Sequence, residues 1–362
     1  MQLRAQPAAV VAFATWLTGL AVFGAATPAS ALPSFADQTG LACSACHAGG
    51  FGPQLTQTGR DFKIAGYTAR SNPKALPLAM MAVGSTTHTS KAQEEAPTDY
   101  SRTNNNTALD ELSLFLAGGL GQHLGAFVQG TYSGAEHHSS WDNVDLRAVS
   151  SSFRLGGSEV RLGLDVNNSP TVQDPWNTLP VWSFPFTQSD LVPTPGTGAL
   201  LSEGLAQTVT GASAYAWINS NLYAEFGLYR QNSESFLHSM GVDTDGANTL
   251  RGSAPYWRLA YQGSGGANSF HVGAFGLSGN IYPEGDRSTG QSDRYTDIGI
   301  DASIQRSMNG NALAFNARLV RETQNLAASE ALGDATNASG RLTEFVGSGS
   351  YFWHNTYGGT VG

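Results

Sequence analysis

Cys43-Ser44-Ala45-Cys46-His47 is the segment of this chain whose residue types and spacing point most directly to chemistry. A C-x-x-C-H sequence is the attachment site of a c-type haem. Its two thiols bond to the vinyl groups of one porphyrin, and the imidazole that follows is placed to ligate the iron. The chain has no other cysteine. The motif therefore predicts one covalently bound haem c, attached through Cys43 and Cys46, with His47 as an iron ligand.

A second interpretation of the same residues is a redox-active disulfide beside an unrelated histidine. Such a pair is expected near a thioredoxin-like βαβ pattern. Gly, Ala and Thr surround the cysteines here, and no such pattern is present. The sequence favours the haem.

The N-terminus indicates export. Arg4 precedes an apolar run over residues 8–26, and Ala29-Ser30-Ala31 has the small-x-small form of a signal-peptidase site. We expect residues 1–31 to be a signal peptide. The alternative is an uncleaved membrane anchor, since the run is close to spanning length. In both cases the haem segment lies outside the cytoplasm.

The remaining residues differ from a soluble cytochrome in composition. Charged residues make up 13% of the chain, and the net charge is −9. Soluble proteins usually carry about a quarter charged residues. No further apolar stretch long enough for a transmembrane helix follows the haem segment. The negative charge argues against nucleic-acid binding and is compatible with attracting cations.

Alternating hydrophobicity predicts β-strands through most of residues 76–362. Leu162, Leu164 and Val166, for example, share one strand face, while Arg161 and Asp165 share the other. The expected strands cover 76–90, 107–122, 124–133, 142–155, 158–167, 204–217, 220–231, 255–263, 267–278, 294–306, 310–323 and 342–354. A soluble β-sandwich also alternates, so this pattern alone leaves the environment of the outer face open.

The connections between these strands alternate between long polar segments and tight turns. That rhythm is typical of an outer-membrane β-barrel with short periplasmic turns and long external loops. The sequence thus predicts a transmembrane antiparallel β-barrel over residues 76–362, with the N-terminus in the periplasm. Residues 356–362 begin a further strand. We expect 14 to 16 strands in the intact barrel, the last ones lying beyond this sequence.

Residues 32–75 form the expected haem segment and are short enough to plug the barrel lumen. We expect the porphyrin to pack against apolar side chains of this segment, namely Phe35, Leu41, Phe51, Leu55, Phe62 and Tyr67. Arg60 and Lys63 are candidates for binding the haem propionates. A solvated helix face is the alternative for both cations.

The first predicted strand offers a sixth iron ligand. Met81 shares strand parity with Ser85 and Thr87, which suit a polar lumen, and parity turns Met80 toward lipid. Met81 is therefore the candidate, and packing alone is its alternative role. His88 of the same strand is the other possible ligand, but parity turns it outward and it lies roughly 20 Å further along the strand.

Two stretches of sequence resemble a known family. Pro33-x-Phe35-Ala36-x-x-Thr39-Gly40 leads into the C-x-x-C-H motif, and Leu55-Thr56-x-x-Gly59-Arg60-x-Phe62-Lys63-x-x-Gly66-Tyr67 follows it. This combination resembles the fused outer-membrane porin–cytochromes, which include ferrous-iron-oxidising outer-membrane cytochromes c. Residues 167–178, with Pro180 and Trp182, resemble the long third outer loop of that group. The resemblance implies electron transfer between extracellular partners and periplasmic carriers.

Three functions are consistent with these features. In the first, the protein carries electrons across the outer membrane of a Gram-negative bacterium, oxidising extracellular Fe(II) and reducing a periplasmic carrier. In the second, electrons flow outward to an external acceptor. In the third, the protein is a passive porin with a structural haem plug. Whether ferrous-iron oxidase activity makes it an enzyme is open.

Overall fold

The computed structural model describes residues 32–186, 188–193, 197–202, 204–245 and 247–362. The predicted signal peptide lies outside the described residues. The chain forms one antiparallel sheet in which neighbours in sequence are neighbours in space. The strands along this path are β1 (Leu78–Thr87), β2 (Asn106–Gly119), β3 (Leu124–Ser133), β4 (His138–Val149), β6 (Ser158–Asn167), β7 (Val209–Ile218), β8 (Leu222–Gln231), β10 (Ser253–Gly265), β11 (Asn268–Tyr282), β12 (Asp293–Met308), β13 (Asn311–Asn325), β14 (Ser339–Trp353) and β15 (Tyr357–Val361).

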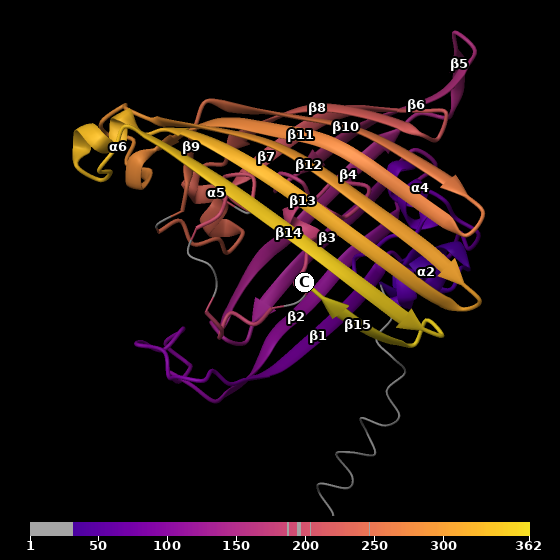
Figure 1. The fold of residues 1–362 in the computed structure, drawn as a ribbon, viewed down its shortest axis with the longest axis horizontal. Coiled ribbons are helices and arrows are strands. Elements are labelled where there is room, and N and C mark those ends of the chain that lie inside the picture. Colours follow the sequence, from indigo (N-terminus) through magenta and orange to yellow (C-terminus); the bar gives the residue numbers. More distant parts are fainter. Residues whose placement is uncertain (1–31, 187, 194–196, 203, 246) are drawn as a thin grey trace, which may run out of the picture.

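The sheet curves around an interior that holds other parts of the chain (Figure 1). Two short strands lie off the main path: β5 (Phe153–Leu155) pairs with β6, and β9 (Thr249–Arg251) pairs with β11. Within the described residues β1 and β15 form the two edges of the sheet and do not pair with each other. The prediction of an all-β chain with one antiparallel meander is confirmed.

One expected strand, 142–155, is interrupted in the structure. Val149 pairs with Gly163, whereas Phe153 pairs with Val160. Between these two pairs, three residues on one strand lie opposite two on the other, which is the arrangement of a β-bulge. Beyond the bulge β5 and the start of β6 form a hairpin that projects past the neighbouring strands (Figure 1).

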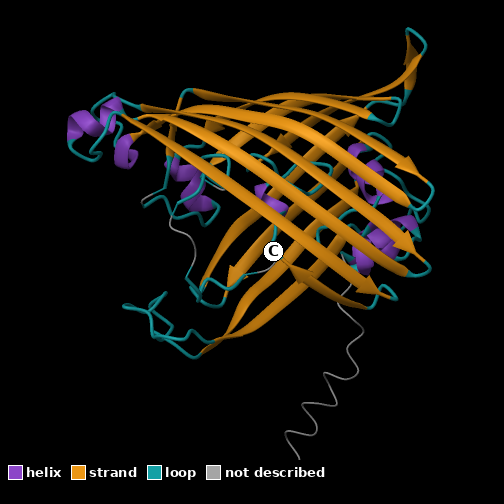
Figure 2. Ribbon diagram, in the orientation of Figure 1, coloured by secondary structure: helices purple, strands orange, loops and turns teal. Residues whose placement is uncertain are grey.

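The two ends of the sheet differ in the length of their connections. Tight turns join the strands at the end where helices α2 (Pro33–Thr39) and α4 (Gln57–Ile64) lie, which we call the short-turn end (Figure 2). Longer connections, with helices α5 (Glu234–Ser239) and α6 (Ala327–Leu332), mark the long-loop end. The connection after β3 is shorter than predicted because β4 already begins at His138.

The sheet has an unusual distribution of side chains. Apolar residues on its convex face are exposed, among them Leu164 at 61%, Ile300 at 57% and Phe345 at 69%. Charged residues on the concave face are buried, and the largest are Arg147 and Arg258. This is the reverse of a water-soluble sheet, whose apolar face is normally the covered one.

The connection between β6 and β7 folds inward. We predicted it as an external loop, but Val172, Trp176 and Leu179 are almost completely buried among residues of the concave face. It contains the short helix η2 (Pro180–Trp182). The segment folds this way because its Asp174 and Trp176 pair with buried side chains of the sheet. Sheet, haem segment and this interior loop therefore form one core.

None of the helices in the described part of the chain has the length and apolarity needed for a membrane crossing.

Glycines in the strands make room for aromatic rings on the concave face. A Cβ on Gly299 would lie 2.3 Å from the ring of Phe275, whereas one on Gly130 would meet nothing closer than 3.9 Å. We expect Gly299→Ala to lower the free energy of unfolding by about 1–3 kcal/mol, because the buried ring has to shift. Gly130→Ala is the matched control and should leave stability within about 0.5 kcal/mol. Denaturant unfolding in detergent measures both, and equal effects would contradict this packing.

Candidate functional site

The haem motif forms one short helical turn. Helix α3 (Cys43–Cys46) holds both cysteines, which are half-buried and not bonded to each other. Residues three apart in a helix lie on the same face, so the two thiols share one side of the turn. The His47 N–H donates to the Cys43 carbonyl oxygen at 2.8 Å, which closes the turn. Burial, with the neighbouring Cys43 as a smaller cause, raises the pKa of the Cys46 thiol.

The His47 ring is held in one orientation. Its Nδ1 lies 2.6 Å from the Gly52 carbonyl oxygen. A carbonyl only accepts, so Nδ1 carries the proton and Nε2 is left as the basic nitrogen. Burial lowers the pKa of His47, against a smaller opposing effect of the bond to Gly52. A neutral imidazole whose other nitrogen donates to a backbone carbonyl is the usual state of a metal-ligating histidine. The donor set of residues 43–47 therefore fits a covalent haem.

Close backbone contacts fix this turn within the segment. His47 pairs with Leu55 in an isolated β-bridge, and helix α4 crosses directly behind the turn. A Cβ on Gly59 would lie 2.3 Å from the Cys46 carbonyl oxygen, so only glycine allows this crossing. On the other side Ala48 packs against Ala312, Ala314 and Phe352 of β13 and β14. The motif is thus anchored to the sheet near the β12–β13 and β14–β15 turns.

The apolar side chains predicted to surround the porphyrin divide into a more buried group and an exposed group. Leu55, only 7% exposed, belongs to the more buried group. Phe35, Phe62 and Tyr67 form an aromatic cluster with ring centroids 5.1 to 5.8 Å apart. Leu41 and Phe51 are 43% and 37% exposed. A cavity beside Phe51 measures about 60 Å³, which is far smaller than a drug-sized ligand pocket. The exposed face near Leu41, Phe51 and the half-buried thiols is therefore the surface available to a porphyrin.

Arg60 and Lys63 contact protein groups in the interior. The Arg60 guanidinium donates to Ser269 Oγ at 3.0 Å and to the Thr56 carbonyl at 3.2 Å. Lys63 Nζ donates to the Val172 carbonyl at 2.8 Å and to Asn177 Oδ1 at 2.9 Å. These bonds dock helix α4 to the sheet and to the interior loop. The propionate role that we predicted for both cations stays a prediction.

Burial changes the acid–base behaviour of both cations. Desolvation lowers the pKa of Lys63 to about 8, opposed by the nearby carboxylate of Asp145. Desolvation likewise lowers the pKa of Arg60 to about 10. The Lys63 ammonium lies 5.1 Å from the centroid of the Trp182 ring, which adds a cation–π contact. Lys63 is thus a cation kept inside the protein by a small number of specific partners.

Arg147 joins the sheet, the haem segment and the interior loop. Its guanidinium lies 2.9 Å from Asp145 and 3.5 Å from Asp165, both on the concave face. It also donates to the carbonyls of Lys63, at 3.3 Å, and of Gln173. Tyr67 adds a second link from the segment, since its hydroxyl donates to Asp145 at 2.5 Å.

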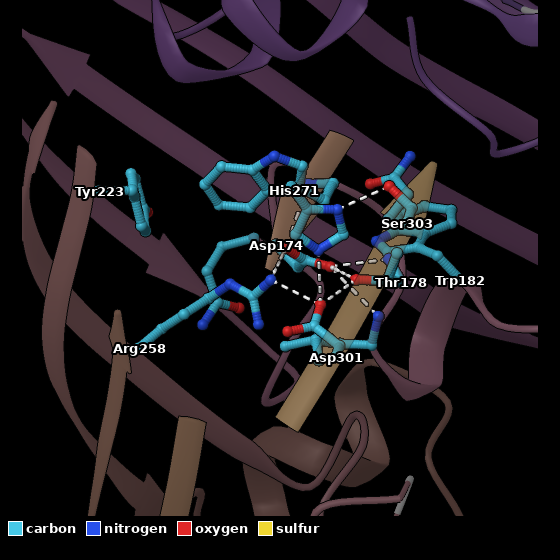
Figure 3. Close-up of polar contacts among 12 residues, drawn as sticks. Asp174, Thr178, Trp182, Tyr223, Arg258, His271, Asp301 and Ser303 are labelled. Carbon is cyan, nitrogen blue, oxygen red and sulfur yellow. Dashed lines mark hydrogen bonds and ion pairs between the residues drawn. The ribbon is translucent and has the colours of Figure 1, made fainter. Parts of the chain in front are cut away.

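A second buried cluster ties the interior loop to the opposite wall (Figure 3). Arg258 of β10 lies 3.2 Å from Asp174 of the loop and 2.8 Å from Asp301 of β12. His271 of β11 contacts the same Asp301 carboxylate at 2.9 Å and stacks on Trp176 of the loop, with ring centroids 5.2 Å apart. All of these side chains are almost fully buried.

The sequence left the partners of these buried charges undetermined. Asp165 stood out as a polar residue on the inward face of its strand, but nothing in the sequence paired it with Arg147 or paired Asp301 with Arg258. His271 belongs to the same polar cluster, where its two ring nitrogens contact Ser303 and Asp301. The sequence did indicate a charged interior, because charged residues alternate with apolar ones within the predicted strands and so share one face. Their partners come from strands and loops distant in sequence, so strand parity alone could not name them.

Met81 lies on the face that parity predicted. It pairs with Ser113, which is completely buried on the concave side, whereas Met80 pairs with Leu114, which is 63% exposed. Residues directly opposite in an antiparallel pair point to the same side. Met81 is itself 37% exposed because β1 is an edge strand. Its role as an iron ligand stays a prediction.

A scan of protein-family models found no match to the chain, and searches of curated proteins and of solved structures found none.

The pKa of Lys63 gives a pH test of the docking of helix α4. The folded protein holds this proton less tightly than the unfolded chain, whose lysine titrates near 10.5. Stability should therefore rise as the pH increases from 8 to 10.5, by up to about 3 kcal/mol. Lys63→Met should remove this part of the pH dependence, and Lys74→Met, at an exposed site, should retain it. Unfolding at several pH values measures the difference, and identical slopes in the two variants would contradict the buried ammonium.

The strand parity of the two methionines gives a test of iron ligation. If Met81 supplies the sixth ligand, Met81→Ala should lower the haem reduction potential and abolish any far-red sulfur-to-iron band. Met80→Ala is the matched control on the opposite face and should do neither. Spectra and potentials unchanged in both variants would remove Met81 from the ligand set.

Proposed function

We propose that this protein is an outer-membrane c-type cytochrome that carries electrons between the two sides of the membrane. The observation that carries the proposal is the His47 geometry within the C-x-x-C-H turn, with Nδ1 bound to Gly52 and Nε2 available. A haem bound there would supply reversible one-electron chemistry. Cys43 and Cys46 would hold it covalently, and Gly52 would keep the His47 ring in the ligating tautomer.

The side-chain distribution of the sheet supports a position in a membrane. Exposed leucine, isoleucine and phenylalanine side chains cover the convex face of many strands, while charges line the concave face. Outer-membrane barrels place apolar residues outward and polar residues inward in this way. Under this proposal the short-turn end, with the haem segment, faces the periplasm and the long-loop end faces outside.

The packing of the interior favours a conduit over a passive porin. Lys63, Arg147 and Arg258 connect the haem segment, the interior loop and the sheet through buried hydrogen bonds and ion pairs. A porin lumen is a water-filled channel, whereas these groups are almost fully buried. Electron transfer, unlike passage of solutes, requires no water-filled channel, so the packed interior is compatible with a conduit.

Fe(II) outside the cell is the donor that we propose, with a periplasmic electron carrier as the acceptor. The resemblance of the haem segment to ferrous-iron-oxidising porin–cytochromes supports this direction. Exposed carboxylates on the long loops also suit a cationic donor. They are Glu94, Glu95, Asp99, Glu136, Glu234, Asp243, Asp245, Glu284, Asp286, Glu330 and Asp334.

Substitutions in the motif test the attachment of haem. Cys43→Ala/Cys46→Ala should abolish covalent haem, because both thioether bonds are lost. His47→Ala should leave haem attached but change its absorption spectrum, because only an iron ligand is removed. Haem staining of denatured protein and absorption spectra measure the two effects. Undiminished staining in the double variant would overturn the proposal.

Proteoliposomes test the direction and the conduit. Fe(II) added outside should reduce trapped hexachloroiridate(IV) when the intact protein is present, while trapped sucrose is retained. The Cys43→Ala/Cys46→Ala variant is the control and should transfer no electrons. Sucrose release by both proteins, without dependence on haem, would instead identify a passive porin.

A charge on the convex face tests the membrane position. Ile300→Arg should cost about 2–4 kcal/mol of stability in a bilayer, because the exposed side chain would face lipid. Leu332→Arg, at a 43% exposed site in α6, is the control and should cost less than about 0.5 kcal/mol. Unfolding from lipid vesicles measures both. If Ile300→Arg leaves stability unchanged, the convex face contacts water.

A further inference from the structure

We infer that the short-turn end of the sheet is a docking surface for an acidic electron-carrier protein. The inference rests on the proposed function, since it assigns a partner to the haem segment. Beyond the proposed function, the inference specifies that the partner is negatively charged and names the residues that bind it.

Exposed charges at the short-turn end are mainly positive. The exposed cations there are Arg70, Lys74, Arg154 and Arg306, and the exposed carboxylates are Asp37 and Glu159. At the long-loop end the acidic residues named above outnumber the exposed cations, so the two ends differ in the sign of their excess charge. The exposed cations of the long-loop end include Lys91, Arg102, Arg230, Arg251, Arg287, Arg294 and Arg341. At physiological ionic strength the Debye length is about 8 Å, so a partner senses the charge of the end that it approaches.

The cations at this end are available to a partner. Within the described part of the chain, no hydrogen bond or ion pair engages the side chains of Lys74, Arg154 and Arg306. Arg70 differs because its guanidinium donates to the Gly119 carbonyl at 2.5 Å. Three of the four side chains are therefore not needed for contacts within the fold and can bind a partner.

These cations lie at the same end of the sheet as the C-x-x-C-H motif. Arg306 follows Gln305, whose side-chain amide donates to the Leu55 carbonyl at 2.8 Å, and Leu55 pairs with His47. Arg70 and Lys74 lie in the connection from α4 to β1. Arg154 lies in the projecting β5–β6 hairpin (Figure 1). A partner bound to these residues would cover the end of the sheet that holds the motif.

Apolar side chains at the same end would add contact area. Phe153 and Leu155 of the hairpin are 41% and 66% exposed. Electron-transfer complexes are small and transient, and complementary charge mainly raises their rate of association. A few apolar contacts within a positive rim suit such a complex.

The test uses one probe protein in two charge forms. Mitochondrial cytochrome c is basic, and succinylation converts its lysines to carboxylates without changing the haem. We expect succinylated cytochrome c to bind the full-length, haem-loaded protein in detergent, with affinity that falls as salt is raised to about 0.15 M. Surface plasmon resonance measures the binding.

The matched variants each remove one lysine and two arginines. Lys74→Gln/Arg154→Gln/Arg306→Gln should weaken binding of succinylated cytochrome c about tenfold, because three exposed positive charges that attract the acidic probe are lost. Lys91→Gln/Arg287→Gln/Arg341→Gln removes the same charge from exposed sites in the long-loop end and should not weaken it.

The outcomes separate this inference from the proposed function. Succinylated cytochrome c that fails to bind at low salt, or that binds both triple variants equally, overturns the inference while haem attachment stands. Absence of covalent haem refutes the proposed function, and the binding experiment still decides whether an acidic protein docks at this end. Equal weakening by the two triple variants would show that only net charge matters and would also overturn the inference.

Discussion

The pairing of two buried arginines with carboxylates on the concave face is the interaction on which the rest of the structure depends. A buried charge is costly unless partners satisfy it. Arg147 and Arg258 each pair with a carboxylate of the sheet and each also contact the interior loop, so their full set of partners forms only when sheet and loop are together. Removal of one partner from such a pair typically costs about 3–5 kcal/mol. The same contacts that compensate the charge therefore specify where the haem segment and the interior loop lie.

Much of the fold was predictable because strand parity is a local property. The alternation of residues 158–167 and 294–306 identified strands and their apolar faces, and the structure confirms one antiparallel meander. The face of Met81 followed from the same rule. The bulge after Val149 escaped prediction because it depends on pairing with β6, and an alternating sequence continues smoothly through it.

The candidate site was predictable in its chemistry and less so in its surroundings. The C-x-x-C-H motif named Cys43, Cys46 and His47, but the bond from His47 to Gly52 needed the backbone path of the segment. Arg60 and Lys63 stood out as cations near the motif. Their contacts with Ser269 and Val172 bring together residues far apart in the sequence, and only tertiary structure supplies them.

The inward path of the loop between β6 and β7 has a consequence for how the protein folds. Helix α4 lies between the sheet and this loop, with Lys63 bonded to Val172 and Asn177 on the loop side. Once the strands have assembled, the segment cannot be threaded beneath the loop without breaking those bonds. The geometry therefore couples the two elements: helix α4 and the loop reach their final contacts together, because each supplies hydrogen-bond partners that the other needs. The half-buried thiols of Cys43 and Cys46 lie on the far side of this helix, so the contacts that hold the segment beneath the loop leave the C-x-x-C-H turn accessible in the assembled fold.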